Sequence, residues 1–399
     1  MTRLLQASLL FTICSLLASC YRDVPWERGE VDGYAPIYST EASLKQITFQ
    51  VPRKTVNGGK LFTAGTLVLQ EEIDSGLHVI SYQDPAHPIK TGFLRIPGFQ
   101  VAAIEGDYLY ANNYDDLIAI RLKTISADMS VGRVVGIWKQ LNYPGGPGVY
   151  FECVDPSKGI VVGWRKTKIS NPQCRRPEDV YDEPIVYSTR NNAGMIAFHR
   201  KLYLVTPDAL AVYSLAYPER PVLTKSKALS GAKVDSLFLF NKELAMSYST
   251  RLDRYDTASL DNVSLYNNLS YCLKVRARGD TAYAIASRKN LCGGASSTLI
   301  KFRLKKDSTG AVELGRLQVG VANAFVIAGS YIYVATSGGM SVVNIAGGKF
   351  DNAGDQFIGD YSDIVNNGNL LFLRDGKQIA CYSIAASPVS PTLLSQLHY

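Results

Sequence analysis

Cys20 is the residue whose surroundings define the most specific chemistry in this sequence. It ends the segment Leu17-Ala18-Ser19-Cys20, which follows Arg3 and an apolar run over residues 4–17. A basic residue, a short apolar run and small residues before a cysteine resemble a lipobox, where a signal peptidase cuts and the thiol takes a diacylglyceryl group. The run is too short, and too often interrupted by polar residues, to span a membrane. We therefore predict a signal peptide over residues 1–20, cleaved before a lipidated Cys20.

The residues that follow Cys20 predict where such a lipid would hold the chain. Several acyl chains, at about 0.8 kcal/mol for each buried methylene, make a stable membrane anchor. Tyr21, rather than Asp, occupies the next position, which favours the outer membrane by the sorting rule of many Gram-negative bacteria. Residues 21–43 are polar and contain Pro and Gly, so they are predicted to form a tether. We expect an outer-membrane lipoprotein on the periplasmic or cell-surface face.

Five of the seven cysteines remain after Cys20 and the cysteine of the signal peptide are set aside. The exported side of a membrane permits disulfides. We predict that Cys153 pairs with Cys174 and Cys272 with Cys292, each stabilising the fold by about 3 kcal/mol through loop closure. Cys381 lies in an alternating apolar stretch, which predicts a free thiol in the core. A zinc site is the alternative for these thiolates, but the sequence has no C-x2-C pair, so no metal is predicted.

A candidate binding surface lies in the excursion over residues 139–190, which does not follow the rest of the chain's pattern. Insertions on a repeating scaffold form loops, and loops carry function more often than the scaffold does. The alternative is a purely structural flap. The residues that we single out are aromatic or basic: Tyr143, Tyr150, Trp164, Arg165 and Lys166.

Composition disfavours several other classes of function. The net charge is +7, but no block of five basic residues occurs, so nucleic-acid binding is not predicted. Only four His are present, which leaves little for a catalytic triad or a His-rich metal site. The pair Asp115-Asp116 reads as a solvated turn, with calcium binding as the alternative. His78 and His199 are expected to be structural. No catalytic residue and no cofactor is predicted.

One element recurs along the chain: an apolar strand, a tight turn, and a second strand of alternating apolar and aromatic residues. Successive turns are separated by about 38 to 52 residues, the size of a four-stranded propeller blade. Most turns are followed by an alternating pentad such as LHVIS (77–81) or LIAIR (117–121), and PIVYS (184–188) is the candidate pentad for the third copy. The turn residues are Gly65, Gly106, Lys158, Arg200, Asn241, Gly279, Gly329 and Gly368.

These repeats predict an all-β fold, a single β-propeller over residues 44–399 with four-stranded blades. Eight turns favour eight blades, and seven is the runner-up because the third copy, around Lys158, is degenerate. A β-sandwich array or a β-solenoid is the alternative architecture. We expect the strand at residues 44–51 to pair into the last blade beside residues 393–399, which would join the two ends of the domain.

The same residues resemble the LVIVD-repeat proteins, a β-propeller family named for its pentad strand, and in particular lipoproteins of Bacteroidetes-type bacteria. The resemblance is carried by GLHVISYQDPAHPIKTGFLRIPG (76–98), YFECVDPSKGIVVGW (150–164) and LCGG (291–294), and it extends over most of the mature chain. It implies an exported propeller and no catalytic residue. Family members tend to have His before Cys-Asp-Pro where this chain has NNLSYCLKV (267–275), so a function tied to those residues is not implied here.

The sequence therefore favours a non-catalytic binding or scaffold protein that is held on the membrane through Cys20 and contacts an envelope protein or glycan through its propeller loops. One alternative is an extracytoplasmic hydrolase or lyase with a site at the channel mouth. Another is an assembly factor that binds envelope proteins by strand addition. Charged groups converging at the channel mouth, with shifted pKa values, would favour an enzyme; a neutral or apolar mouth would favour a scaffold.

Overall fold

The computed structural model describes residues 29–40, 42–138, 148–175, 194–206, 209–229, 234, 236–240, 243–247, 251–267, 273–287, 296–304, 311–356 and 359–399. Their regular structure is β-strand with a few short 3-10 turns. No helix in these residues is long and apolar enough to cross a membrane. The chain divides into two compact units, unit 1 (Met1–Ser39 with Tyr143–Pro184) and unit 2 (Thr40–Asn142 with Ile185–Tyr399).

The described part of unit 2 contains seven antiparallel sheets, numbered here in chain order. Sheet 1 holds β3 (Gly58–Ala64), β4 (Leu67–Glu72), β5 (Gly76–Ser81) and β6 (Ile89–Arg95), with β2 (Thr48–Gln50) added beyond β6. Sheet 2 holds β7 (Ala102–Glu105), β8 (Tyr108–Asn113), β9 (Asp116–Arg121) and β10 (Val131–Val134). Sheet 3 holds β14 (Met195–Phe198), β15 (Lys201–Val205), β16 (Ala209–Ser214) and β17 (Val222–Ala228).

The other four sheets repeat this order of consecutive strands. Sheet 4 holds β18 (Ser236–Phe240), β19 (Glu243–Ser247), β20 (Arg251–Asp256) and β21 (Asn262–Asn267). Sheet 5 holds β22 (Leu273–Arg278), β23 (Thr281–Ser287), β24 (Ser297–Leu304) and β25 (Ala311–Gln318). Sheet 6 holds β26 (Ala322–Ala328), β27 (Tyr331–Thr336), β28 (Gly339–Asn344) and β29 (Asp351–Gln356). Sheet 7 holds β30 (Asp363–Asn367), β31 (Leu370–Arg374), β32 (Gln378–Ser383) and β33 (Thr392–His398).

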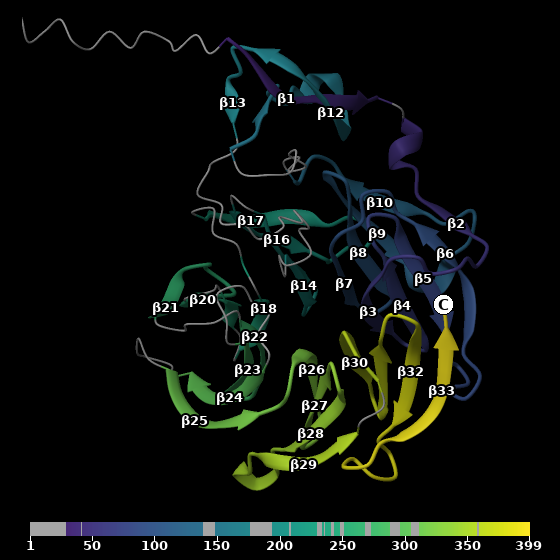
Figure 1. The fold of residues 1–399 in the computed structure, drawn as a ribbon, viewed down its shortest axis with the longest axis vertical. Coiled ribbons are helices and arrows are strands. Elements are labelled where there is room, and N and C mark those ends of the chain that lie inside the picture. The colour runs from purple at the N-terminus through teal and green to yellow at the C-terminus, as the bar shows by residue number, and fades with distance from the viewer. Residues whose placement is uncertain are drawn as a thin grey trace, which may run out of the picture. The chain divides into compact units, whose positions relative to one another are not determined.

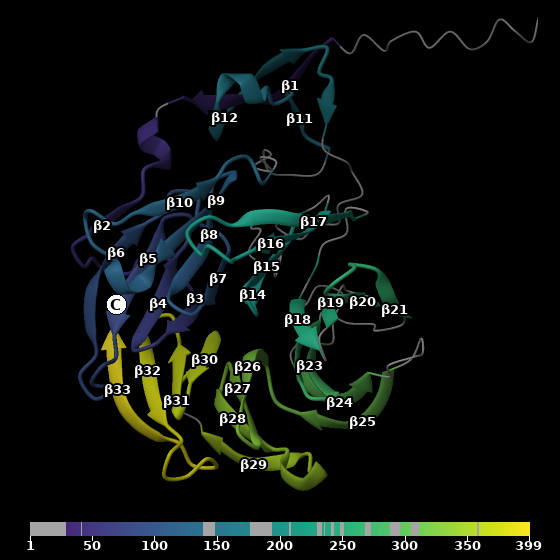
Figure 2. The same ribbon diagram turned by 180° about the vertical axis from the view of Figure 1, so that it is seen from behind.

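The seven sheets follow one another around a closed ring. The first strand of each sheet contacts the first strand of the next, and β30 of sheet 7 contacts β3 of sheet 1 (Figures 1 and 2). Seven apolar cores fill the spaces between neighbouring sheets, one for each pair. Four-stranded antiparallel sheets arranged in this way form a β-propeller, whose first strands line the central channel. The all-β propeller prediction is therefore confirmed.

Six of the eight predicted turns join the first and second strands of these sheets, and Asn241 lies outside the described residues. Gly279, for example, lies between β22 and β23 with φ +61°, a conformation that glycine adopts without steric cost. The corresponding turn of sheet 3 has no glycine, and His199 and Arg200 there adopt positive φ values of +50° and +59°. The described pentads form the third strands of the same seven sheets. PIVYS (184–188) lies outside the described residues.

The turn predicted at Lys158 is the exception. Lys158 ends a 3-10 turn (Pro156–Lys158) that leads into β12 (Ile160–Ser170), and this segment belongs to unit 1. Its alternating apolar residues do form a strand, but period-2 alternation does not reveal which sheet a strand joins. The expected eight blades are not confirmed, because the eighth sheet among the described residues lies in unit 1.

The propeller closes differently from our expectation. The strand predicted to pair beside residues 393–399 instead pairs with β6 in sheet 1, with Thr48 opposite Arg95. The Phe49 ring covers Gly92, and a Cβ at Gly92 would lie 2.1 Å from the Phe49 Cζ, so glycine makes room for this strand. Sheets 1 and 7 meet through their shared apolar core and through a hydrogen bond of 2.7 Å from the Leu61 N–H to the Asp363 carboxylate.

Unit 1 contains one four-stranded sheet with the order β12-β1-β11-β13, formed with β1 (Glu30–Ser39), β11 (Tyr150–Phe151) and β13 (Cys174–Arg175). β1 pairs antiparallel with β12 along its length and parallel with β11. Part of the expected tether over residues 21–43 is thus a strand. Gly33 permits the close packing, since a Cβ there would lie 2.5 Å from the Ile169 Cδ1. The polar composition of residues 30–39 did not predict a strand, because its partners β11 and β12 come from the excursion over residues 139–190.

Candidate functional site

The aromatic residues predicted to bind a partner contact other side chains of unit 1. The Trp164 ring packs edge-on against Phe151, with ring centroids 5.6 Å apart. The Arg175 guanidinium lies over the Tyr150 ring at 4.9 Å. Packing of this kind stabilises the sheet and reduces the aromatic surface that remains for a partner.

The two basic residues of the same prediction are exposed to solvent, whereas the aromatic residues pack against other side chains. Arg165 and Lys166 are exposed on β12, and they lie opposite Ala35 and Tyr34 of β1 in the strand register. Tyr143 lies outside the described residues. The structure therefore places four of the five residues on one sheet and leaves their role in binding a prediction.

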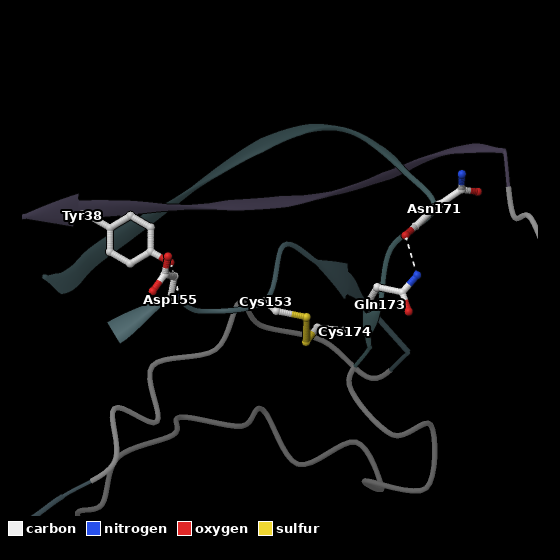
Figure 3. The surroundings of a disulfide bond; sticks show 6 residues. All are labelled: Tyr38, Cys153, Asp155, Asn171, Gln173 and Cys174. Carbon is white, nitrogen blue, oxygen red and sulfur yellow. Dashed lines mark hydrogen bonds between the residues drawn. A yellow bond between two sulfur atoms is a disulfide. The ribbon is translucent and has the colours of Figure 1, made fainter. Parts of the chain in front are cut away.

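The disulfide between Cys153 and Cys174 is confirmed (Figure 3). It joins the segment after β11 to the start of β13, so it closes the loop that contains β12. Beside it, the Asp155 N–H donates a hydrogen bond of 2.6 Å to the Tyr38 hydroxyl, and the Gln173 side chain donates one of 3.2 Å to the Asn171 carbonyl. Cys381 is free and buried in the core between sheets 1 and 7, as predicted. Cys272 and Cys292 lie outside the described residues.

In unit 2, the strand β22 carries a row of basic side chains that the sequence analysis did not single out. Lys274, Arg276 and Arg278 alternate with the buried or partly buried Val275 and Ala277, so the three basic side chains project from one face of the strand. All three reach the neighbouring sheet 6, where they donate hydrogen bonds to the backbone carbonyls of Asn323, Phe325 and Gly329. The bond from Arg276 Nε to the Phe325 oxygen measures 2.9 Å.

Two more charged residues lie on other sheets of the ring. Lys60 is exposed on β3 of sheet 1, and Asp363 is the first residue of β30 in sheet 7. Their charges act on Lys274, and Asp363 also acts on Arg276. We name Lys60, Lys274, Arg276 and Asp363 the inner charged cluster. Its members come from three sheets, and the bond from the Leu61 N–H to Asp363 places the Lys60 segment of β3 beside β30.

Lys274 and Arg276 are surrounded by other protein groups and are also accessible to solvent. Burial lowers the pKa of Lys274, Asp363 raises it, and Lys60 and Arg276 lower it further. Burial also lowers the pKa of Arg276, and Asp363 raises it. Both side chains nevertheless stay accessible to solvent. Side chains surrounded by protein but in contact with water are typical of a propeller's central channel.

Two other polar groups of unit 2 are bound within the protein. His78 is fully buried, and its Nε2 lies 2.9 Å from the Glu72 carboxylate, which also accepts hydrogen bonds from the Val56 and Asn57 N–H groups. Asp116 is buried and ion-paired with Arg133 at 2.6 Å and Lys45 at 2.9 Å.

The pair Asp115-Asp116 is therefore not a simple solvated turn. Lys45 contacts both carboxylates, at 2.6 Å for Asp115 and 2.9 Å for Asp116, so a cation of the protein occupies the place where calcium was the alternative. Within the described residues, no group of three or more His, Cys, Asp or Glu is arranged to hold a metal ion.

The sequence contained a signal for the members of the inner charged cluster on β22 but not for the other two. The stretch LKVRAR (273–278) alternates basic and apolar residues before a recognised turn, which marks a first strand with one charged face. Lys60 and Asp363 gave no such signal, because their proximity depends on the closure between sheets 1 and 7.

Comparisons with known proteins bear on the fold. No family model matches the sequence, and no curated protein matches it. Among solved structures, the computationally designed Ika8 protein superposes with a TM-score of 0.50 and 8% identity, covering 87% of this chain and 88% of that chain. The β-propeller domain of Myceliophteria thermophila Cps50 (Swd1) gives a TM-score of 0.48 and 10% identity, covering 85% of this chain and 99% of that chain. Kluyvelomyces marxianus Hsv2 gives 0.44 and 9%, covering 82% and 92%.

Proposed function

We propose that this protein is an exported, lipid-anchored binding or scaffold protein whose partner is recognised at the propeller. The observation that carries the proposal is the basic row on β22, in which the exposed side chains of Lys274, Arg276 and Arg278 bridge sheets 5 and 6 through backbone carbonyls. Side chains brought together from distant parts of a chain at a solvent-accessible place are the usual composition of a binding site. By the criterion set from the sequence, charged groups with shifted pKa values favour an enzyme over a scaffold with a neutral mouth, so these basic residues support the enzymatic alternative as well as a binding site.

We further propose that the chain is a seven-bladed member of the LVIVD-repeat family. Its support is the agreement between repeat and structure: six described turns join first and second strands, and seven pentads form third strands. The departure at NNLSYCLKV (267–275) overlaps the start of β22 and includes Lys274, so this copy differs from the family within its own charged strand.

Anchoring through Cys20 in the outer membrane is part of the same proposal and rests on the lipobox sequence. Mass spectrometry of protein purified from native membranes tests it. A mature N-terminus at Cys20 that carries acyl chains is expected. Release of the Cys20→Ser variant from the membrane fraction is the second expected result, and an unmodified Cys20 in the mature protein would contradict the anchor.

Crosslinking and pull-down from native membranes test the binding function. The wild-type chain is compared with Lys274→Gln/Arg276→Gln and with Arg165→Gln/Lys166→Gln, since both double variants remove two positive charges. We expect an envelope protein or glycan to be captured by the wild type and lost in the first variant. Equal capture by all three chains would show that the inner charged cluster does not recognise the partner.

An enzymatic role is the second candidate, and one observation favours it. Burial lowers the pKa of Lys274, as it does for lysines that act as bases or nucleophiles. A hydrolase or lyase that used this amine would lose turnover in Lys274→Gln while still binding its substrate. A substrate screen that gave such turnover would replace the binding role with a catalytic one.

A further inference from the structure

We propose that the outer edge of β33 in sheet 7 binds an extended segment of a partner protein, which joins the sheet as a fifth strand. The segment is uncharged, alternates polar and apolar residues, and pairs with Gln396–His398. This inference extends the proposed binding function to a second surface and does not depend on the basic row of β22. It follows from a fifth strand in sheet 1, from the register of the fourth strands and from the residues of β33.

The first argument is that this propeller already holds a fifth strand at one outer edge. β2 pairs antiparallel with β6, the fourth strand of sheet 1, with Thr48 opposite Arg95 and Gln50 opposite Phe93. Arg95 also donates a hydrogen bond of 3.0 Å to the Gln46 carbonyl just before β2. An outer edge of this fold therefore binds an extended segment, the mode of recognition called strand addition.

The second argument is that strand register identifies the equivalent segment in sheet 7. In sheet 1, Gly92 of β6 lies opposite Val79, the centre of the pentad. In sheet 7, Ser395 of β33 lies opposite Cys381, the centre of that pentad. β2 pairs with the three residues that follow Gly92, so the equivalent residues of β33 are Gln396–His398. Both strands have a β-bulge just before these positions, so the bulge does not prevent addition.

The third argument is that β33 lacks a charged residue that other fourth strands have at the centre of this contact. β6 has the uncharged Phe93 at the position of Gln396, whereas β10 has Arg133 and β25 has Arg316. Charged side chains on an outer strand disfavour pairing with another strand. Gln396 and His398 are exposed, and no described strand pairs with the outer edge of β33 (Figures 1 and 2).

The neighbouring residues also favour β33 over β17. In β17, Lys225 and Lys227 flank the position that corresponds to the centre of the contact. In β33, the pairing segment follows Leu393 and Leu394, whose side chains are 40% and 37% exposed. Exposed apolar side chains beside a free edge offer contacts to the side chains of an incoming strand.

A second copy of the chain is the competing occupant, because two uncharged edges can also pair with each other. β2 favours the extended segment, since it is three residues long and brings no further strand with it. The two occupants predict different results. A second copy makes the protein dimeric without any added peptide, whereas an extended segment binds to the monomer.

The test is fluorescence anisotropy of a labelled synthetic peptide, QITFQV, which has the sequence of residues 46–51, titrated with the purified full chain. We expect saturable binding. Gln396→Lys/His398→Lys is expected to weaken it roughly tenfold, since lysines on an outer strand disfavour pairing. Val312→Lys/Leu314→Lys is the matched control, because it adds two lysines to β25 at positions 39% and 41% exposed, and it should leave binding unchanged.

Hydrogen–deuterium exchange locates the bound peptide, and circular dichroism verifies that each variant folds. Slower exchange is expected in residues 392–398 and not in residues 311–318. A peptide with Thr48→Pro/Phe49→Pro is the second control. Neighbouring residues of a strand direct their N–H groups to opposite edges, so two adjacent prolines remove a donor whichever edge pairs, and binding is expected to be lost.

Absence of saturable binding, equal weakening by the two double variants of the protein, or protection confined to a strand other than β33 would overturn the strand-addition site. A dimer found by sedimentation without peptide, with β33 protected, would assign the edge to a second copy. If the pull-down still loses its partner in Lys274→Gln/Arg276→Gln, the proposed binding function stands although the site on β33 has failed. Failure of both experiments would remove the two proposals together.

Discussion

Unit 1 and unit 2 hold their strands by different means. In unit 2, seven apolar cores lie between successive sheets, so each sheet is buried on both faces by its neighbours. Unit 1 has one sheet with few fully buried apolar residues, among them Phe151, Val161 and Ile169, and a disulfide. Small structures with a limited core depend on covalent crosslinks, whereas a ring distributes its stability over repeated interfaces.

The largest expected effect comes from the core that closes the ring. Phe372 is 1% exposed, and its ring lies 4.6 Å from that of Tyr82 across the interface of sheets 7 and 1. Phe372→Ala is expected to lower the free energy of unfolding of unit 2 by about 3–5 kcal/mol, measured in urea. Leu393→Ala, at a position 40% exposed on β33, is the control and should cost far less. Equal losses would mean that sheets 1 and 7 do not share a core.

Removal of the disulfide tests whether the two units unfold independently. Cys153→Ser/Cys174→Ser opens a loop whose ends are 21 residues apart, which should remove about 3 kcal/mol from unit 1. Hydrogen exchange is expected to become faster in β1 and β12 and to stay the same in the seven sheets. Faster exchange throughout unit 2 would show that the two units do not unfold independently.

A dependence on pH between pH 7 and pH 5 is expected in unit 2, because all four histidines (78, 87, 199 and 398) belong to it. Burial lowers the pKa of His78 below 6.5, and the hydrogen bond to Glu72 offsets part of this shift. The unfolded chain therefore binds this proton more tightly, so the stabilisation is present above pH 6.5 and is lost as the pH falls through the lowered folded-state value.

The expected slope below pH 6.5 is at most about 1.4 kcal/mol per pH unit for one proton. His78→Gln should reduce the change in the urea midpoint of unit 2 between pH 7 and pH 5. His87→Gln, at an exposed residue, should leave that change as it is in the wild type. A slope that survives in His78→Gln would assign the titration to another group.

The smallest effect on stability is expected from the exposed cations of unit 1. Arg165→Gln and Lys166→Gln should each change the free energy of unfolding by less than about 0.5 kcal/mol, because neither side chain is buried. Thermal unfolding followed by circular dichroism measures this. A larger loss would show that these cations stabilise the sheet and are not a free surface.

The sequence allowed the repeating part of the fold to be predicted because turns and pentads are local signals. Glycine turns and alternating pentads identified the first three strands of most sheets, and the Cys153–Cys174 pairing was confirmed. Local signals did not show which sheet a strand enters. For this reason, β1 was taken as tether, Lys158 as a blade turn, and residues 44–51 as part of the last blade.

The candidate site depended still more on long-range closure. LKVRAR on β22 was visible as an alternating basic strand, whereas Lys60 and Asp363 lie near each other only because the two ends of unit 2 meet. The aromatic residues Tyr150 and Trp164 attracted attention by type, yet each packs against a side chain of its own sheet. The type of a residue predicts which chemistry it can do, and closure of the ring determines which residues lie close to one another.

Hydrogen–deuterium exchange of the wild-type chain and of the Phe372→Ala variant tests most directly whether sheets 1 and 7 close the ring. Faster exchange in the variant is expected to appear together in residues 67–72 and 370–374, which are distant in sequence and share one core. Residues 160–170 of unit 1 should not change. Faster exchange confined to residues 370–374 would contradict a ring closed between these sheets.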